Sequence, residues 1–203
     1  MKIYHIRKLS GKDTDFRPTM LDALQSVGRY KDTRKIEVFI VSGFFDNNVL
    51  SFYDQTVRTN LLRELSQFSE VNLVGSYSGR NKLMQIKNNL LQAGINVTAY
   101  YKPKFHAKIF VIKVDGVSVF EIIGSSNMTN CAYCGQTSRA RVSQNFEADL
   151  VICDDALNVK LEPSETVMKF IYNKDDNNGI SIQRRMEDVT NILSSVMIDK
   201  NKI

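Results

Sequence analysis

Two kinds of hydrophobic pattern alternate between residues 35 and 101, and this alternation constrains the fold more than any other feature of the sequence. Three segments rich in β-branched and aromatic residues, 35–45, 70–77 and 95–101, have the composition of buried strands. Apolar residues recur at helical spacing between these segments: Val49, Tyr53, Val57, Leu61, Leu65 and Phe68, then Leu83, Ile86, Leu90 and Leu91. The order strand, helix, strand, helix, strand is typical of parallel α/β sheets.

Further strands and helices are predicted on both sides of this unit. The additional strands are expected over 106–114, 117–124 and 146–154. The additional helices are expected over 17–30, near 163–172 and over 181–197. Pro18 suits the first turn of its helix, and Asp115-Gly116 indicates a hairpin between two of the strands. We therefore predict a single α/β domain over residues 1–203, in which a mixed, largely parallel β-sheet is sandwiched between helices.

Composition and charge limit the kind of protein. Hydrophobic residues make up 43% and charged residues 24% of the 203 residues, which is the balance of an ordinary globular protein with a full core. A net charge of +5 and an isoelectric point of about 9.0 give a mild preference for polyanions. No apolar run reaches the length of a membrane span, and no secretion signal is evident. We expect a cytoplasmic protein without membrane contact.

The cysteines give no strong indication of a metal site or a disulfide framework. The chain has three of them, Cys131, Cys134 and Cys153, and an odd number argues against a disulfide framework. Cys131 and Cys134 have the spacing of half a zinc site or of a redox pair, but a closed zinc site needs four ligands and no second pair exists. We expect reduced cysteines and neither metal nor cofactor.

His106 is one of only two histidines, and its surroundings suggest chemistry. On a strand, His106 and Lys108 share one face because side chains alternate with a period of two. After the hairpin, Gly124 allows a close backbone approach and is followed by the small polar residues 125–127. An imidazole nucleophile, an ammonium group and neutral donors suit attack on a phosphodiester. The alternative for the first two residues alone is an ordinary histidine and lysine at the surface of a strand.

Two carboxylates on a later strand could orient the histidine. A nucleophilic imidazole must present one nitrogen to phosphorus, and a carboxylate on its other nitrogen fixes the tautomer and raises the basicity. Glu147 is the first candidate for this role. Asp149 lies two positions further on the same face of the strand and is the second candidate.

The segments FHAKIFVI, IIGSSNMT and NFEADLVI resemble the phospholipase D superfamily, and most closely its restriction endonucleases of the NgoFVII and BfiI kind. The resemblance covers about residues 100–153. Lys113 stands where the full superfamily motif has an aspartate, and the hairpin is longer than in that motif; both departures count against a phospholipase.

The resemblance implies a phospholipase D-like α-β-α fold and a role for each matched residue. His106 would be the nucleophile, Lys108 and Asn127 would bind the phosphate, Ser125 would be a supporting donor, and Glu147 would orient the histidine. It also implies two steps without a metal: a phosphohistidine forms, and a second histidine protonates the leaving oxygen and then activates water.

The second histidine of such a mechanism must come from elsewhere. His5 has no glycine-serine-asparagine partner and is expected to be an ordinary surface or strand residue. The second histidine is therefore expected from a second copy of the chain, in a homodimer with one active site on its two-fold axis.

Basic residues near these motifs are candidates for contact with nucleic-acid phosphates. Lys102 and Lys104 come just before His106, and Arg139 and Arg141 lie in a long polar loop over 130–145. At the C-terminus a narrow apolar stripe is expected to pack on the sheet or to contribute to a dimer interface: Ile182, Met186, Val189, Leu193 and Val196.

Three functions fit the sequence. The first is a metal-independent DNA endonuclease of a restriction or defence system, which would either be non-specific or take its target specificity from a separate partner. The second is a phosphodiesterase of the same superfamily that acts on phospholipid or small diesters, although the loop over 130–145 is polar and basic rather than amphipathic. The third is a catalytically silent DNA-binding module. The sequence leaves the target sequence and the choice between DNA and RNA open.

Overall fold

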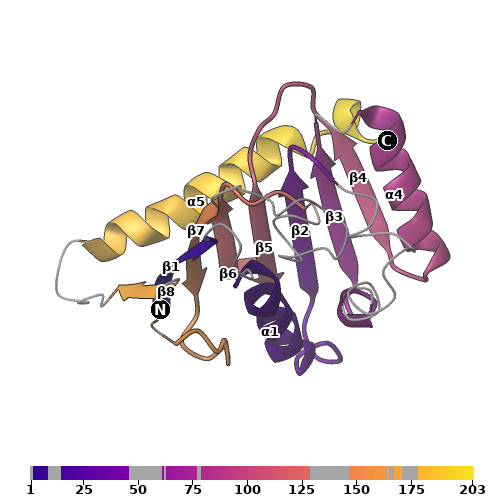
Figure 1. Ribbon diagram of the computed structural model, residues 1–203. Helices are drawn as coiled ribbons and strands as arrows, with labels where there is room; N and C mark the ends of the chain where they lie inside the picture. Colours follow the sequence, from indigo (N-terminus) through magenta and orange to yellow (C-terminus); the bar gives the residue numbers. More distant parts are fainter. Residues whose placement is uncertain are drawn as a thin grey trace, which may run out of the picture.

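The computed structural model describes residues 2–8, 15–45, 61, 63–76, 79–128, 147–162, 164, 167–170 and 178–203. Within these residues, eight strands form one sheet in the order β4-β3-β2-β5-β6-β7-β1-β8, as Figure 1 shows. The strands are β1 (Lys2–Lys8), β2 (Ile36–Ser42), β3 (Glu70–Gly75), β4 (Val97–Tyr101), β5 (Ile109–Val114), β6 (Val117–Gly124), β7 (Glu147–Cys153) and β8 (Val167–Phe170). The helices are α1 (Phe16–Gly28), α4 (Arg80–Gln92) and α5 (Asn178–Val196), followed by a short 3-10 turn over Asp199–Asn201.

The mixed α/β class is confirmed, but the parallel part of the sheet is smaller than expected. Strands β2, β3 and β4 pair in parallel, with α4 as the connection between the last two. The other five described pairings are antiparallel. Two features cause this: β5 returns beside β2 in the opposite direction, and β1 inserts between the C-terminal strands β7 and β8.

The hairpin between β5 and β6 is confirmed at the predicted place. Asp115 and Gly116 have φ values of 50° and 81°, and positive φ at both central residues is the signature of the tight turn favoured in hairpins. The Asp115 carboxylate accepts hydrogen bonds from the Arg34 side chain at 2.7 Å and from the Lys35 backbone at 2.9 Å. The turn is thereby tied to the start of β2.

The helix predicted near 163–172 is wrong, because 167–170 forms strand β8. This strand pairs antiparallel with β1, with Ile3 opposite Phe170 and Ile6 opposite Val167. Val167 is buried, whereas Met168 is largely exposed, as expected for alternating side chains on an edge strand. A segment this short fits either period, so the pairing with β1 decided its conformation.

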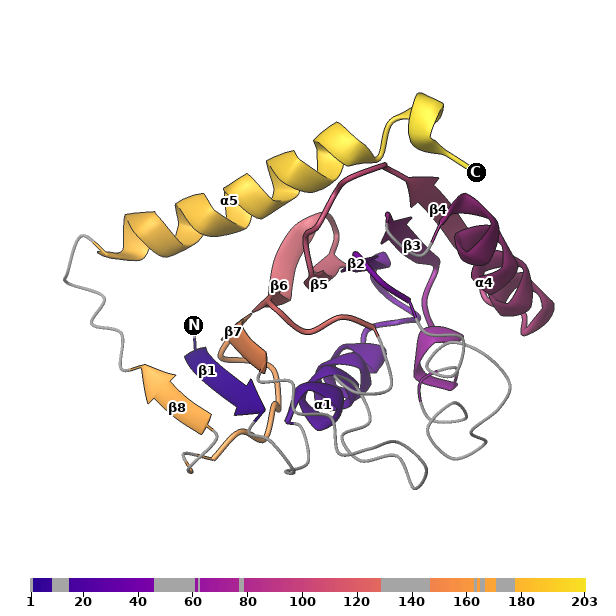
Figure 2. The ribbon, with the colours of Figure 1, turned by 45° about the horizontal axis from the view of Figure 1, so that its top comes forward.

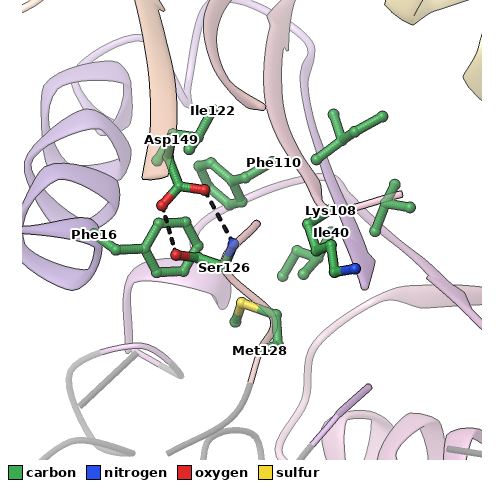
Figure 3. A pocket seen from close by; sticks show the side chains of 10 residues that line it. Phe16, Ile40, Lys108, Phe110, Ile122, Ser126, Met128 and Asp149 are labelled. Carbon is green, nitrogen blue, oxygen red and sulfur yellow. Dashed lines mark hydrogen bonds between the residues drawn. The ribbon is translucent and has the colours of Figure 1, made fainter. Parts of the chain in front are cut away.

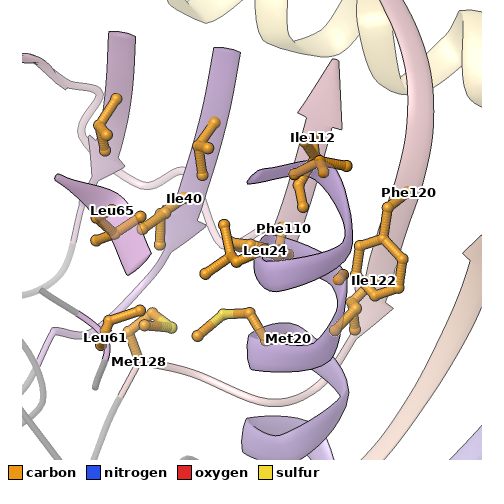
Figure 4. Packing of buried hydrophobic residues seen from close by; sticks show 14 of the residues in the cluster. Met20, Leu24, Ile40, Leu61, Leu65, Phe110, Ile112, Phe120, Ile122 and Met128 are labelled. Atoms are coloured by element: carbon orange, nitrogen blue, oxygen red, sulfur yellow. The ribbon is translucent and has the colours of Figure 1, made fainter. Parts of the chain in front are cut away.

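Helices cover both faces of the sheet. Figure 2 shows α1 and α5 on opposite sides. Residues from α1 and α4 belong to one large core with one face of the sheet, which we call the α1-side core. Figure 4 shows its centre, where Met20 and Leu24 of α1 pack against Ile40 and Phe110.

The opposite face carries a smaller apolar cluster under α5, which we call the α5-side cluster. Val189, Leu193 and Val196 of α5 pack there with Val41 and Val111 of the sheet, among others. The expected packing of the C-terminal stripe on the sheet is confirmed for these three residues. Its share in a dimer interface stays a prediction.

Two expectations concern parts of the chain that are only partly described. The helix marked by Val49 to Phe68 falls mostly outside the described residues, although Leu61 and Leu65 are helical and fully buried in the α1-side core. No helix in the described part of the chain is long and apolar enough to span a membrane.

Candidate active site

The predicted catalytic residues gather at one edge of the sheet, which we call the site edge. Here β2 and β6 end while β5 and β7 begin, because these neighbouring strands run antiparallel. The segment 105–108 precedes β5, the turn 125–127 follows β6, and Glu147 starts β7. Pairing of Ile109 with Ile123 and of Gly124 with Asp149 brings the three segments side by side.

His106 and Lys108 lie in the segment just before β5, rather than on the strand itself as expected. They do project together, because the Lys108 ammonium nitrogen lies 2.6 Å from Nε2 and 2.9 Å from Nδ1 of His106. Phe105 and Ala107 face the other way and pack against the α5-side cluster, as the alternation predicts. His106 is exposed, while Lys108 is 9% exposed.

Lys108 reaches the site from a mostly apolar cavity in the α1-side core. Figure 3 shows its side chain with Ile40, Met128 and Ser126 among the lining residues. Burial lowers the pKa of the Lys108 ammonium below its ordinary value, and the nearby charge of Glu147 acts in the opposite direction. Lys108 is therefore a buried cation that is held beside the imidazole.

The turn after β6 depends on Gly124. A Cβ atom at this position would lie 2.2 Å from Oδ1 of Asp149 and 2.4 Å from the carbonyl oxygen of Ala148. This close approach lets the Ser125 backbone donate to the Ala148 carbonyl at 3.1 Å. Glycine is therefore required here to bring the turn against β7, as the sequence suggested.

The two carboxylates of β7 have different partners. Asp149 is 4% exposed and accepts hydrogen bonds from the backbone N–H of Ser126 at 3.1 Å and from its hydroxyl at 2.5 Å. Both bonds are drawn in Figure 3. Burial raises the pKa of Asp149, although the bonds to Ser126 oppose the shift. Asp149 therefore holds the turn, which makes it a poor candidate for orienting the histidine.

Glu147 lies closer to the surface, at the site itself. Its carboxylate accepts a hydrogen bond from the Ser125 hydroxyl, which also accepts one from the Ala148 backbone at 2.9 Å. Its negative charge favours the protonated form of Lys108 and so raises the pKa of that ammonium group, which contacts His106. Of the two carboxylates, Glu147 is thus the one placed next to the catalytic candidates.

Asn127 is held in place partly by Ser42, a residue that the sequence analysis missed. Oδ1 of Asn127 accepts hydrogen bonds from the backbone N–H of Phe44 at 3.2 Å and from the hydroxyl of Ser42 at 3.3 Å. The Ser42 hydroxyl has one proton, which it shares between Asn127 and the Phe44 carbonyl oxygen at 2.5 Å, and its oxygen accepts the backbone N–H of Met128 at 3.0 Å. These contacts assign the amide orientation, so the Asn127 NH₂ group is the end left to meet a substrate. A serine at the end of an apolar strand was the only signal.

Lys113, at the position where the motif that this sequence resembles has an aspartate, points away from this site. Its ammonium group lies 5.2 Å from the ring centroid of Phe39, a member of the α5-side cluster. Lys108 instead lines the cavity on the α1 side. Lys113 therefore lies outside the candidate site.

The remaining predicted residues are placed as follows. Lys102 and Lys104 lie at the site edge in the turn before His106, where the Lys102 backbone donates to Gly75 at 3.1 Å. Arg139, Arg141, Cys131 and Cys134 lie outside the described residues. Cys153 is a free, buried cysteine, and burial raises the pKa of its thiol to about 11. Among the described residues, no three His, Cys, Asp or Glu side chains group in a way that could hold a metal ion.

His5 lies in β1, as a strand residue, and the alternation of side chains places it on the face of the sheet opposite the pocket. Tyr4 and Ile6, its neighbours on the strand, both belong to the α1-side core. Because side chains alternate along a strand, His5 points to the opposite face of the sheet. Lys108 and the cavity it lines are on the α1 side.

Comparisons with known proteins give little beyond this geometry. The sequence matches no protein-family model and no curated protein. Solved structures with weak similarity include TrmBL2, an archaeal chromatin protein, at 9% identity and a TM-score of 0.36, and polyphosphate kinase from Porphyromonas gingivalis, at 15% identity and a TM-score of 0.35. The alignments cover 76% and 84% of this chain but only 46% and 26% of those chains. Similarities this weak carry no argument about function.

Proposed function

We propose that this chain is a metal-independent phosphodiesterase of the phospholipase D type that cleaves DNA through a phosphohistidine intermediate. The observation that carries the proposal is the convergence of four chemical groups at the site edge. An imidazole, the ammonium of Lys108, the amide of Asn127 and the Ser125–Glu147 pair come from separate parts of the sequence. Their types match what attack on a phosphodiester requires.

The geometry supports a division of labour in the first step. A nitrogen of His106 attacks phosphorus, the bond to the leaving oxygen breaks, and that oxygen takes a proton from a second imidazole. The Lys108 ammonium lies 2.6 Å from the ring, so it is within reach of an oxygen on a phosphorus bound to that ring. The Asn127 NH₂ group is a second donor for the phosphoryl oxygens.

In the second step, the second imidazole takes a proton from water, and the resulting hydroxide attacks phosphorus. The bond between phosphorus and His106 then breaks, which restores the nucleophile. The chain has two histidines, and His5 faces the other side of the sheet. A homodimer that places His106 of a second copy across a two-fold axis would supply the missing group.

The choice of DNA as substrate rests on charge. The chain carries a net charge of +5, and Lys102 and Lys104 lie just before His106 at the site edge. We further propose that it belongs to the restriction-type branch of the superfamily and acts in a restriction or defence system. Hydrolysis of phospholipid or small diesters is the alternative substrate class, and DNA binding without cleavage is the alternative activity.

Cleavage of plasmid DNA in excess EDTA tests the proposal. The wild type and His5→Ala should cleave, while His106→Ala should not; His5→Ala is the matched control because it removes the other histidine from the opposite face. Loss of cleavage on chelation, with recovery in Mg²⁺, would contradict the mechanism. Hydrolysis of bis-p-nitrophenyl phosphate or lipid without DNA cleavage would select the alternative substrates, and DNA binding without any hydrolysis would select the silent module.

A further inference from the structure

Phe44 is an exposed aromatic residue in a stretch that is otherwise buried. Residues 38–43 and Phe45 are buried, while Phe44 is 44% exposed. A single exposed apolar side chain is common on protein surfaces and needs no explanation by itself. Phe44 differs from such residues because its backbone is hydrogen-bonded to Asn127 of the candidate site.

The backbone of Phe44 is bonded to the turn that presents Asn127 and to Ser42 at the end of β2. Its N–H donates to Oδ1 of Asn127 at 3.2 Å, and its carbonyl accepts from the Ser42 hydroxyl at 2.5 Å. The next residue, Phe45, is buried and forms a β-bridge with Met128. The backbone that carries this aromatic ring is therefore tied directly to the proposed phosphate-binding amide.

The order of strands places this ring between two other features of the site edge. Phe44 follows β2, which lies between β5 and β3 in the sheet. His106 and Lys108 precede β5 on one side. On the other side, the turn that carries Lys102 and Lys104 follows β4 and bonds to the end of β3. Along this edge, the pair His106 and Lys108 comes first, Phe44 follows, and the basic turn with Lys102 and Lys104 comes last.

We propose that Phe44 stacks on a base next to the scissile phosphate, so that the site takes single-stranded DNA in preference to duplex. This inference rests on the proposed function and adds the substrate class. Aromatic rings beside a basic track are the usual means of binding single strands, because every base has a face that can stack. In a duplex that face is covered by the neighbouring bases and becomes available only if they are unstacked.

A tryptophan probe can test the contact directly. The chain contains no tryptophan, so Phe44→Trp introduces a single fluorophore at the proposed stacking position. Val117→Trp is the control: this residue is 66% exposed and lies at the hairpin, at the opposite end of β6 from the site. Both variants are made in the His106→Ala background so that the ligand stays intact. The ligands are a thymidine oligonucleotide and an abasic oligonucleotide of the same length, which has the same phosphates without bases.

We expect the thymidine oligonucleotide to quench the indole fluorescence of the Phe44→Trp variant and the abasic one to leave it nearly unchanged. The Val117→Trp variant should respond to neither ligand. Phe44→Ala should weaken binding of the thymidine strand by roughly tenfold or more, with little effect on the abasic strand. In the wild type, cleavage of single strands should exceed that of duplex, and Phe44→Ala should reduce this preference.

The outcomes separate the inference from the function on which it rests. If the wild type cleaves DNA while the fluorescence of Phe44→Trp does not change and Phe44→Ala binds both strands normally, the stacking role is wrong and the nuclease function stands. A wild type that cleaves duplex faster than single strands likewise overturns the inference. If the wild type neither binds nor cleaves any DNA, the proposed function fails and the inference fails with it.

Discussion

Glu147→Gln and Asp149→Asn replace two carboxylates of one strand with amides of nearly the same shape, and the structure predicts different outcomes. Asp149 is buried and bonds to both donors of Ser126, whereas Glu147 bonds to Ser125 beside the catalytic candidates. An asparagine at 149 can still accept from the Ser126 backbone with Oδ1 and donate to its hydroxyl with the NH₂ group. We therefore expect Asp149→Asn to keep the turn in place.

The magnitudes follow from the hydrogen bonds. Asp149→Asn should change the free energy of unfolding at neutral pH by no more than about 1 kcal/mol, since one bond of this kind contributes about that amount. Asp149→Ala leaves two buried donors of Ser126 without an acceptor, at about 1–3 kcal/mol each, so a loss of about 2–6 kcal/mol is expected. Chemical denaturation of the three proteins measures both values.

The pH dependence gives an independent readout of the same residue. Burial raises the pKa of Asp149 in the folded protein above its ordinary value of 3.8. Between 3.8 and the higher folded pKa, the folded state binds more protons than the unfolded state, so the free energy of unfolding falls as the pH rises through this window. In Asp149→Asn, the free energy of unfolding should not show the contribution of Asp149 to this decrease. Glu121, whose pKa burial also raises, is present in both proteins and cancels in the comparison.

The rate of DNA cleavage should depend strongly on Glu147 and only weakly on the charge of Asp149. Loss of the carboxylate that orients a catalytic imidazole costs about 10⁴ in kcat in a serine protease triad, so we expect Glu147→Gln to lose at least about 100-fold. Asp149→Asn should stay within a few-fold of the wild type. A folded Asp149→Asn protein without activity, together with an active Glu147→Gln protein, would refute this assignment of roles.

Four further predictions concern the same edge of the sheet. Gly124→Ala forces a Cβ atom against backbone and should destabilise the protein by about 3 kcal/mol or more in a thermal melt, whereas Gly28→Ala meets only the flexible Gln67 side chain and should cost much less. Lys108→Ala should lower the cleavage rate by about 10²–10³. Because burial lowers the pKa of Lys108, wild-type activity should fall at a pH below 10.5 as the ammonium loses its proton; a rate that holds to that pH would remove the charge from the mechanism. Equal amounts of wild type and His106→Ala, with free subunit exchange, should retain about a quarter of the activity; retention of half, or a monomeric wild type in sedimentation, would exclude the shared site.

Local pattern in the sequence was sufficient for several parts of the structure. The strands β2, β3 and β4, the tight turn at Asp115-Gly116 and the common face of His106 and Lys108 all depend on residues a few positions apart. Periodicity and turn chemistry encode such features directly, because they depend on the local backbone. The same reasoning selected Gly124, whose close approach to β7 the structure confirms.

Other features were decided by contacts between distant parts of the chain. The segment 167–170 became a strand because β1 offered an edge to pair with, and β5 reversed the direction of the sheet by lying beside β2. The bond between Ser42 and Asn127 joins residues 85 positions apart, and nothing local marks it. The sequence placed Glu147 and Asp149 on one face with equal chemistry. The sequence ranked Glu147 first, but the contacts that distinguish the two come from the tertiary structure, in which Asp149 is buried beside Ser126 and supports the turn while Glu147 lies at the site.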